Sequence, residues 1–289
     1  MDFDGFLKKV KDSGWEFYGI EVFLDGKVIH SYEKIPGKRY PIYSATKTIT
    51  ATAAGIAAAE GKFDIHATVY DCFRKELSSG ISPEQTENLK KITIKRLLTM
   101  SVEGYPFRPQ GEDWIADSLR YPLKDVEQKI FCYSNIPACL VGAAVEIAVG
   151  EPLMEYLKPR LWDPLEIRNP VWKNCPSGHF YGASGMEMTV NELSRIGQLY
   201  LQNGVYGGQQ LLDPVWVREA TSVQQRNREG GYGYFIWKYK EGYRISGKWG
   251  QRCFVFPDRR LMVTFLANVQ EDSEKQKLIQ AMEQYLTEC

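Results

Sequence analysis

Metal-binding and disulfide-forming residues are scarce in this chain. It has 289 residues but only three histidines, and none of its six cysteines belongs to a Cys-x-x-Cys pair. No histidine stands at ligand spacing from another histidine or from a cysteine pair, so no structural zinc site is expected. The cysteines are expected to be free thiols, as is usual in a reducing compartment.

The chain also lacks net charge and long apolar runs. It has 36 basic and 36 acidic residues, which leaves no basic surface for a nucleic-acid backbone. The apolar stretches 51–59 and 138–149 are shorter than the roughly 20 residues of a membrane-spanning helix. The N-terminus, residues 1–4, is acidic where a secretory leader is basic. We therefore expect a cytoplasmic chain without nucleic-acid or membrane partners and without a metal or other cofactor.

Two common catalytic motifs are missing. No Gly-x-Ser-x-Gly occurs, which excludes the nucleophile elbow of an α/β hydrolase. Residues 242–249 match the motif of a phosphate-binding loop except at its last position. Trp249 stands there in place of the Ser or Thr that ligates magnesium. Moreover, residues 253–256 continue as a predicted strand, whereas that loop must open a helix. Nucleotide binding is therefore not expected.

The N-terminal quarter of the chain predicts a helix, a hairpin and a buried helix. Residues 2–12 are amphipathic, and two strand-like runs, Phe17–Leu24 and Lys27–Glu33, flank Asp25-Gly26. That dipeptide supplies the positive φ angles of a tight hairpin turn. The run from 44 to 61 is rich in Ala, Thr and Gly, which indicates a helix covered on most sides by close neighbours.

The rest of the chain predicts an inserted helical part and a second group of strands. Helical patterns occur at 92–100, 136–149, 153–161 and from 190 onward, strands at 232–240, 243–246, 252–256 and 261–267, and a last helix near 278–286. Short connections imply antiparallel neighbours, so these strands should share one sheet with the N-terminal hairpin. We expect an α+β fold, with a sheet domain from residues 1–61 and 180–289 and a mainly helical domain from 62–179.

The first candidate site is Ser44-Ala45-Thr46-Lys47, a Ser-x-x-Lys at the start of a helix. Side chains three residues apart are neighbours on a helix but face opposite sides on a strand. Ser31 and Lys34 have the same spacing but lie on a predicted strand, so Lys34 cannot act on Ser31. Lys47, on a helix, can take the hydroxyl proton of Ser44. The helix N-terminus would also offer N–H groups to an oxyanion. The alternative is an N-cap serine beside a solvated lysine.

Two further candidates lie downstream. Tyr133-Ser134-Asn135 is the only Tyr-x-Asn in the chain. Its phenol could transfer protons and its amide could bind a substrate carbonyl, although a loop tyrosine and a helix-capping Asn are the alternative. The turn Ile245–Gln251 could present a second N–H to an oxyanion, but it could equally be an ordinary glycine-rich turn.

In this order, the three motifs resemble those of the serine beta-lactamase and penicillin-binding-protein-like family, in its class C and esterase branch. The resemblance extends over most of the chain, because segments between and after the motifs also match: ITIKRLLTM, EPLMEYLKPRLWDPL and GKWGQRCFVFPDRRLMV. The resemblance implies a beta-lactamase/transpeptidase-like fold, in which an antiparallel sheet flanked by helices meets a helical domain. The active site would lie in the groove between them.

The resemblance also implies roles for the residues that match. Ser44 would be the acylated nucleophile and Lys47 the base in acylation. Tyr133 would exchange protons with the leaving group and with the deacylating water, and Asn135 would orient the substrate. Lys47 must be largely neutral to act as a base, so the site is expected to desolvate it or to place it near another cation.

The third element matches only in part. Ser246 and Gly247 agree with the family pattern, and the N–H groups of Ser44 and Lys248 would form the oxyanion hole. Ile245, however, stands where the family has Lys or His, which argues against efficient binding of the carboxylate of a beta-lactam. Three nearby cations could supply the missing charge: Arg244, Lys248 and Arg252.

The sequence thus predicts a serine hydrolase that acts through an acyl-enzyme on ester or amide bonds of small molecules or short peptides. A second interpretation is a genuine beta-lactamase, which is disfavoured by Ile245 and by the absence of an export leader. A third, of another class, is an inactive ligand-binding or interaction module on the same fold. The presence of a complete set of reactive residues favours an enzyme over such a module.

Overall fold

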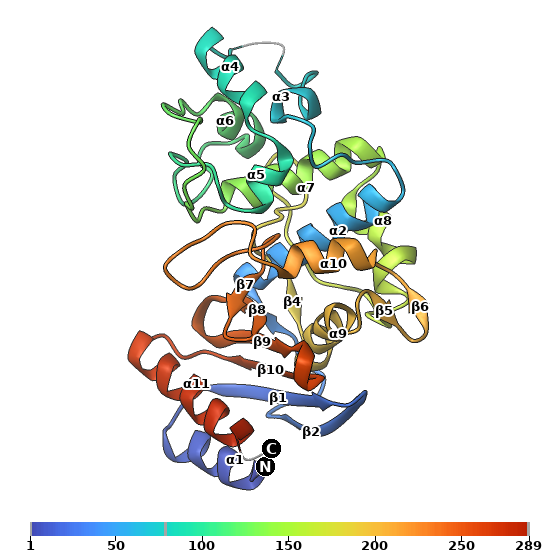
Figure 1. Ribbon diagram of the computed structural model, residues 1–289, viewed down its shortest axis with the longest axis vertical. Helices are drawn as coiled ribbons and strands as arrows, with labels where there is room; N and C mark the ends of the chain where they lie inside the picture. Colours follow the sequence, from blue (N-terminus) through green and yellow to red (C-terminus); the bar gives the residue numbers. More distant parts are fainter. Residues whose placement is uncertain (1, 78–79, 288–289) are drawn as a thin grey trace.

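The protein is built around one six-stranded antiparallel sheet, which lies below a group of helices in the computed structural model (Figure 1). The structure describes residues 2–77 and 80–287. The order of the strands is β2-β1-β10-β9-β8-β7. Their bounds are β1 Phe17–Leu24, β2 Lys27–Glu33, β7 Trp237–Tyr239, β8 Gly242–Gly247, β9 Gln251–Phe256 and β10 Leu261–Ala267. The prediction that the hairpin and the C-terminal strands share one sheet is confirmed.

Local sequence explains the N-terminal half of this sheet. Asp25 and Gly26 both have positive φ, at 51° and 85°, and join β1 to β2 as expected for a tight turn. Strand β10 pairs with β1 on one side and with β9 on the other. Because it is central, all seven residues of β10 are buried.

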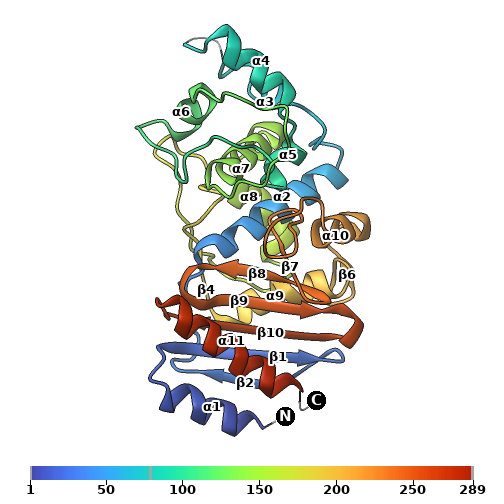
Figure 2. The ribbon, with the colours of Figure 1, turned by 60° about the vertical axis from the view of Figure 1, so that its left-hand side comes forward.

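Helices cover both faces of the sheet. Helices α1, Phe3–Asp12, and α11, Asp272–Thr287, lie side by side on one face (Figure 2). They share an apolar cluster with Val22 and Phe265 of the sheet. Helix α9, Val190–Leu201, packs on the other face, where a Cβ on Gly197 would touch the sulfur atoms of β9 and β10 side chains. The last amphipathic helix covers the sheet as the sequence predicts.

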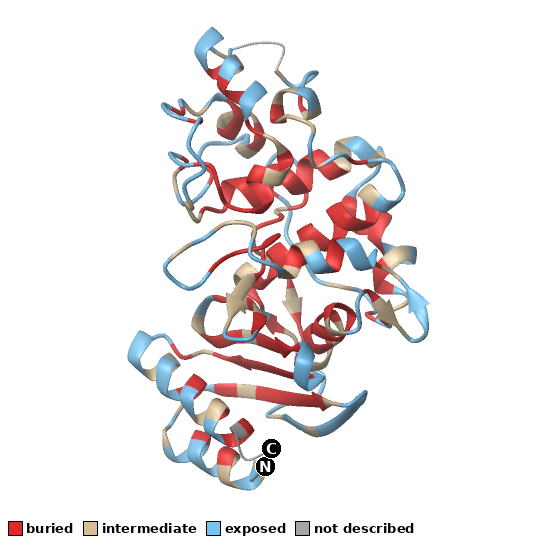
Figure 3. Ribbon diagram, in the orientation of Figure 1, coloured by how far each residue is buried: buried red, intermediate tan, exposed pale blue. Residues whose placement is uncertain are grey.

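Helices α2, Thr46–Ala59, and α7, Ile136–Val149, form the buried centre of the molecule (Figure 3). Residues 46–57 of α2 are all buried, as the small-residue composition predicts. The helices α3 to α8 lie between residues 62 and 179, and α3 to α6 gather at the end of the molecule opposite α1 and α11 (Figure 1). The bounds of the remaining helices are α3 Val69–Cys72, α4 Pro83–Lys91, α5 Ile94–Leu98, α6 Trp114–Arg120, α8 Leu153–Leu157 and α10 Pro214–Thr221.

Two predicted elements differ from the structure. The expected strand 232–240 is reduced to β7, because the preceding backbone bonds elsewhere: Tyr234 N–H donates to Ala220 and Phe235 N–H to Leu98. Phe235 also has φ of 56°, which no strand residue adopts. The expected helix 153–161 is α8 followed by a π-helical turn, Lys158–Trp162.

No single helix in the described ranges is long and apolar enough to cross a membrane. Two helical segments, Ile136–Val149 and Leu153–Trp162, meet the length and composition requirement only as a pair, and they are bent by 75° to each other. The first ten residues of that pair, 136–145, are buried inside the protein. The five described cysteines are free thiols, as predicted, and Cys289 lies outside the described residues.

Candidate active site

Ser44 lies in a short 3₁₀ turn, Tyr43–Ala45, directly before α2. The turn follows strand β3, Tyr40–Pro41, which pairs with β4, Glu187–Met188. The N-cap residue of α2 is Ala45, and no side chain caps this helix. The alternative of an N-cap serine is therefore wrong. The hydroxyl of Ser44 is instead engaged by Lys47.

Lys47 is buried and contacts three groups of the site. Its Nζ lies 3.0 Å from Oγ of Ser44, 2.7 Å from Oδ1 of Asn135 and 3.0 Å from the carbonyl oxygen of Ala183. The side chain is 1% exposed, so the alternative of a solvated lysine is also wrong. No carboxylate in the described part of the chain forms an ion pair with it. Burial lowers the pKa of Lys47 to about 7, so a substantial part of the amine is neutral near pH 7.

Tyr133 completes a triangle with these two residues. Its phenol lies close enough to the hydroxyl of Ser44 for that hydroxyl to lower its pKa, and Nζ of Lys47 lies 5.0 Å from the centre of its ring. Burial raises the pKa of Tyr133 to about 12, against the opposing effects of Ser44 and of the charge on Arg252. The phenol is therefore protonated at neutral pH and can donate a proton. The ring is held in an aromatic cluster: Phe107, Tyr232 and Trp237.

Asn135 occupies the N-cap position of α7, but its side chain does not cap the helix. Ser134 does so instead, because its Oγ accepts from the N–H of Ile136 at 3.1 Å. The amide of Asn135 bridges two residues of the site, as Oδ1 accepts from Lys47 and Nδ2 donates to the hydroxyl of Tyr181 at 3.0 Å. The alternative of a helix-capping Asn is wrong. Sequence reasoning missed Tyr181, which no motif singles out.

The end of strand β8 lies against the segment that leads to Ser44. A Cβ on Gly247 would stand 2.1 Å from the carbonyl oxygen of Ile42, so only glycine allows this approach. Within residues 2–77 and 80–287, neither the N–H of Ser44 nor the N–H of Lys248 has a hydrogen-bond acceptor. The N–H of Lys248 follows the glycine that contacts the segment leading to Ser44, and a developing oxyanion requires two free N–H donors of this kind.

Two aromatic residues connect the segment that contains Ser44 with the end of β8. The rings of Tyr43 and Trp249 meet edge to face at 5.1 Å, next to Ser44 and Lys248 respectively. Both residues have positive φ, 48° and 63°, which is unusual for large side chains. Strain of this kind collects at functional sites because the surroundings must hold it. The side chain of Lys248 is exposed and its Nζ lies 4.1 Å from the Trp249 ring.

Strand β9 carries one of the three cations that could replace the absent Lys or His of the third element. Ile245 is fully buried in the core that faces α9, opposite Cys253. Ser246 is partly exposed and pairs with Arg252 on β9. Of the three candidate cations, Arg252 is the one whose charge acts on Tyr133.

Arg252 is held by main-chain carbonyl groups. Its Nη1 donates to the carbonyl of Gly247 and, at 2.9 Å, to that of Gln251. Burial lowers the pKa of Arg252 to about 10, which leaves it charged at neutral pH. Arg244, by contrast, forms an ion pair with Glu229. Gln251 has a packing role, since it is 1% exposed and its Nε2 donates to Ala267 at 2.5 Å.

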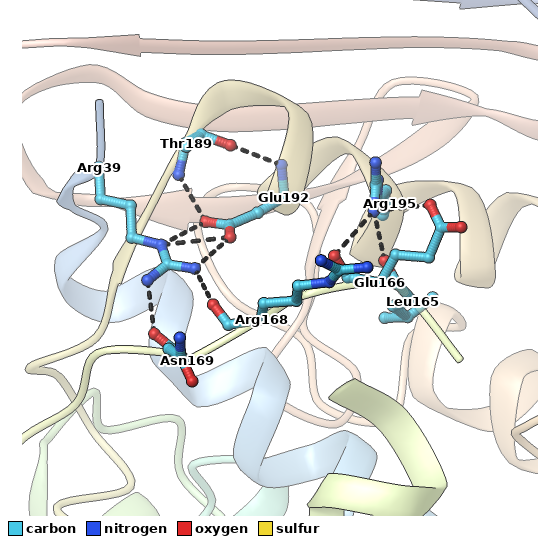
Figure 4. Close-up of polar contacts among 8 residues, drawn as sticks. All are labelled: Arg39, Leu165, Glu166, Arg168, Asn169, Thr189, Glu192 and Arg195. Atoms are coloured by element: carbon cyan, nitrogen blue, oxygen red, sulfur yellow. Dashed lines mark hydrogen bonds and ion pairs between the residues drawn. The ribbon is translucent and has the colours of Figure 1, made fainter. Parts of the chain in front are cut away.

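An ion pair anchors the segment before Ser44 (Figure 4). Arg39 binds the carboxylate of Glu192 through Nε, at 2.9 Å, and through Nη2, at 2.5 Å. Its guanidinium also donates to the carbonyl oxygens of Arg168 and Asn169. Glu192 in turn forms a capping box with Thr189 at the start of α9. The chain entering the site is thus tied to α9 and to the loop at 168–169.

The arrangement places a serine hydroxyl against a buried amine and near a protonated phenol, a set of groups that can support nucleophilic catalysis. Ser44, Lys47, Tyr133 and Asn135, predicted from the sequence, come together, and Gly247 lies against Ile42, two residues before Ser44. In the described ranges, no three His, Cys, Asp or Glu side chains form a group that could hold a metal ion.

Comparisons with known proteins agree with this geometry. A family model described as Beta-lactamase matches residues 21–286. No curated protein matches the chain.

Several solved structures share the fold. A candidate 6-aminohexanoate-dimer hydrolase from Bacillus anthracis is similar with a TM-score of 0.80 and 17% identity, over 97% of this chain and 81% of that one. A penicillin-binding-protein homologue from Caulobacter crescentus gives 0.75 and 16%, over 97% and 95%. A beta-lactamase from Sulfitobacter sp. EE-36 gives 0.75 and 15%, over 98% and 96%. These likenesses establish the beta-lactamase/transpeptidase-like α+β fold that the sequence predicts.

Proposed function

The chain belongs to the beta-lactamase family, and we propose that it is a serine hydrolase that forms an acyl-enzyme with esters or amides of small molecules or short peptides. The observation that carries this proposal is the 3.0 Å contact between Oγ of Ser44 and the buried Nζ of Lys47. An amine that is partly neutral near pH 7 can remove the hydroxyl proton as the serine attacks.

In acylation, each group of the site would have a distinct role. Neutral Lys47 accepts the proton of Ser44 while Oγ bonds to the substrate carbonyl carbon. The N–H groups of Ser44 and Lys248 stabilise the negative oxygen of the tetrahedral intermediate. Tyr133 donates its phenolic proton to the leaving group as the scissile bond breaks, and it regains a proton from the Lys47 ammonium.

Deacylation reverses these proton transfers. A water molecule attacks the acyl-enzyme, and the Lys47–Tyr133 pair takes its proton. The pair then returns a proton to Oγ of Ser44 as the acid product leaves. Asn135 supports both steps because its amide holds Lys47 on one side and faces the cavity that would contain substrate on the other.

Hydrolysis of beta-lactams is the second candidate. It is favoured by Arg252, a partly buried cation whose charge acts on Tyr133 and that could attract a substrate carboxylate in place of the absent Lys or His. It is disfavoured because Arg252 already donates to the carbonyl oxygens of Gly247 and Gln251. We propose that beta-lactams are at most slow substrates, and slow nitrocefin turnover would support this ranking. Turnover comparable to that of a dedicated beta-lactamase would reverse it.

An inactive module on the same fold is the remaining alternative. Desolvating a lysine without a counter-charge is costly, and a chain without catalysis gains nothing from that cost. The burial of Lys47 at Ser44 therefore supports an enzyme. A cytoplasmic location and the domain boundaries at 61/62 and 179/180 stay predictions from the sequence.

Labelling with a reactive fluorophosphonate tests the proposal without knowledge of the substrate. Intact mass is measured for the wild type, for Ser44→Ala and for a control, Ser31→Ala, whose serine is exposed on β2. We expect one adduct on the wild type and on the control, and none on Ser44→Ala. A folded wild type that stays unmodified would instead support the inactive module.

A further inference from the structure

A cavity of about 600 Å³ opens beside the candidate active site. Asn135 lies in its wall, so a molecule bound there reaches the residue that holds Lys47. The β3–β4 pair and the loops at 108–114 and 173–185 form the rest of the wall. Six of the thirteen lining residues are apolar or aromatic: Pro41, Tyr43, Pro109, Trp114, Tyr181 and Met186.

The aromatic wall has a defined geometry. The rings of Trp114 and Tyr181 meet edge to face at 4.8 Å, and the hydroxyl of Tyr181 is fixed by Asn135. Tyr43, on the side of Ser44, is held by Trp249 at 5.1 Å. Rings fixed in this way offer apolar contact area at little entropic cost. The cavity is therefore suited to an apolar part of a substrate.

The positive and negative charges of the residues that line the cavity do not cancel. Arg108 and Lys173 both line it, and neither forms an ion pair with any carboxylate of residues 2–77 and 80–287. Glu187 is the acidic residue among the lining side chains. Arg39 and Glu192 do not line the cavity, and they neutralise each other. The lining thus carries a net charge of +1, with two cations free to meet a ligand.

Both cations flank Tyr181. The carbonyl oxygen of Lys173 accepts from the N–H of Tyr181 at 3.1 Å, and the first atoms of the Lys173 side chain pack on Gly185. Arg108 lies close enough for its charge to act on the phenol of Tyr181. The positive end of the cavity is therefore built around the residue that orients Asn135.

We propose that this cavity binds the part of the substrate on the Asn135 side of the scissile bond, and that this part joins an apolar body to an anionic group recognised by Arg108 and Lys173. The inference rests on the proposed function, because it names the substrate class of the same site. A carboxylate is the simplest such group, since both cations can donate charge-assisted hydrogen bonds to it. Glu187 opposes an anion, so the preference is for one negative charge rather than several.

Two matched pairs of chromogenic esters test the proposal. In the first pair the acyl part differs: mono(para-nitrophenyl) adipate has a free carboxylate, and its methyl ester has none. In the second pair the leaving group differs: para-acetoxybenzoate is compared with methyl para-acetoxybenzoate. The quantity measured is the ratio of kcat/KM for the anionic ester to kcat/KM for the neutral ester.

The variant that removes the cations is Arg108→Gln/Lys173→Gln. We expect the ratio to fall about tenfold in one of the two pairs, and to fall in the wild type as ionic strength rises. Glu187→Gln should raise the same ratio. The charge-matched control is Lys27→Gln/Arg260→Gln, which removes two exposed cations near the β1–β2 turn and should leave the ratio unchanged.

The outcomes separate this inference from the proposed function. A ratio that the cavity variant and salt leave unchanged in both pairs would overturn the inference, even if both esters are hydrolysed. A wild type that hydrolyses none of the four esters and takes no fluorophosphonate label at Ser44 would overturn the proposed function, and the inference with it. A ratio that falls in the cavity variant but not in the control supports both.

Discussion

The Nζ of Lys47 lies 2.7 Å from Oδ1 of Asn135, although 88 residues separate the two in the sequence. This contact gives the buried amine a neutral partner. No carboxylate among the described residues pairs with Lys47, so burial alone determines its lowered pKa. The base strength of the site therefore depends on residue 135 remaining uncharged.

Replacement of Asn135 by Asp should shift the activity to higher pH. A carboxylate at 2.7 Å would stabilise the ammonium form of Lys47, and an opposite charge this close raises a pKa by about 1 to 3 units. Acylation at pH 7 should thus fall at least about tenfold and recover at alkaline pH. The measurement is the rate of acylation by an ester or fluorophosphonate from pH 6 to 10. Asn203→Asp, exposed after the end of α9, is the control and should keep the wild-type profile.

Loss of the Tyr133 hydroxyl should slow acyl transfer without unfolding the protein. Proton donation by a positioned side chain contributes about 10²- to 10⁴-fold in rate, and we expect Tyr133→Phe to lose an amount in this range. The measurements are kcat for an activated ester and the circular dichroism spectrum. Tyr232→Phe removes a hydroxyl from the neighbouring ring and serves as the control. A Tyr133→Phe rate equal to that of the wild type would remove this residue from the proton relay.

A methyl group at position 247 should separate the two halves of the oxyanion site. The Cβ would overlap the carbonyl oxygen of Ile42 at 2.1 Å, so β8 must move away from Ser44. We expect Gly247→Ala to lower kcat and to reduce the free energy of unfolding by about 1–3 kcal/mol. Gly142→Ala is the matched control, because its nearest contact would be an ordinary 3.4 Å. Equal effects of the two substitutions on kcat would contradict the proposed position of the Lys248 N–H.

The Arg39–Glu192 ion pair should contribute to the free energy of unfolding together with the hydrogen bonds that surround it, rather than as an isolated pair. Both side chains are mostly buried, at 22% and 12% exposure, and Arg39 also binds two carbonyl groups. We expect Arg39→Met to lower the free energy of unfolding by about 2–4 kcal/mol, because it leaves Glu192 unpaired. Urea denaturation of Arg39→Met, Glu192→Gln and the double variant measures the coupling. Strictly additive losses would show that the pair does not act as a unit.

Much of the fold follows from local sequence patterns. The hairpin follows from Asp25-Gly26, and the Ser44–Lys47 contact follows from the three-residue spacing of neighbours on a helix. The short connections between the C-terminal strands predict their antiparallel order. The predicted strand 232–240 is only partly formed, as β7, because Ala220 and Leu98, which accept the N–H groups of Tyr234 and Phe235, come from distant segments that no local pattern indicates.

The site was predictable only where its residues stand in short motifs. Tyr181 lies 46 residues from Asn135 on a loop, so its hydrogen bond depends on tertiary structure alone. The same holds for Arg252, which lies on the strand beside Ile245 and not at the motif position itself. The sequence named three cations that could replace the one absent at Ile245, and only the pairing of β8 with β9 puts Arg252 opposite Ser246, where its charge acts on Tyr133.

The rate of acylation as a function of pH tests the central claim, that Lys47 is the base. Burial lowers the pKa of Lys47 to about 7 and raises that of Tyr133 to about 12, so the amine loses its proton well before the phenol does. We therefore predict that single-turnover acylation of Ser44 rises with pH, with a midpoint near 7, and then stays level to about pH 10. Lys47→Ala should abolish acylation of Ser44 and, with it, the rise in rate near pH 7. A rate that is independent of pH between 5 and 9, or that persists in Lys47→Ala, would contradict the account.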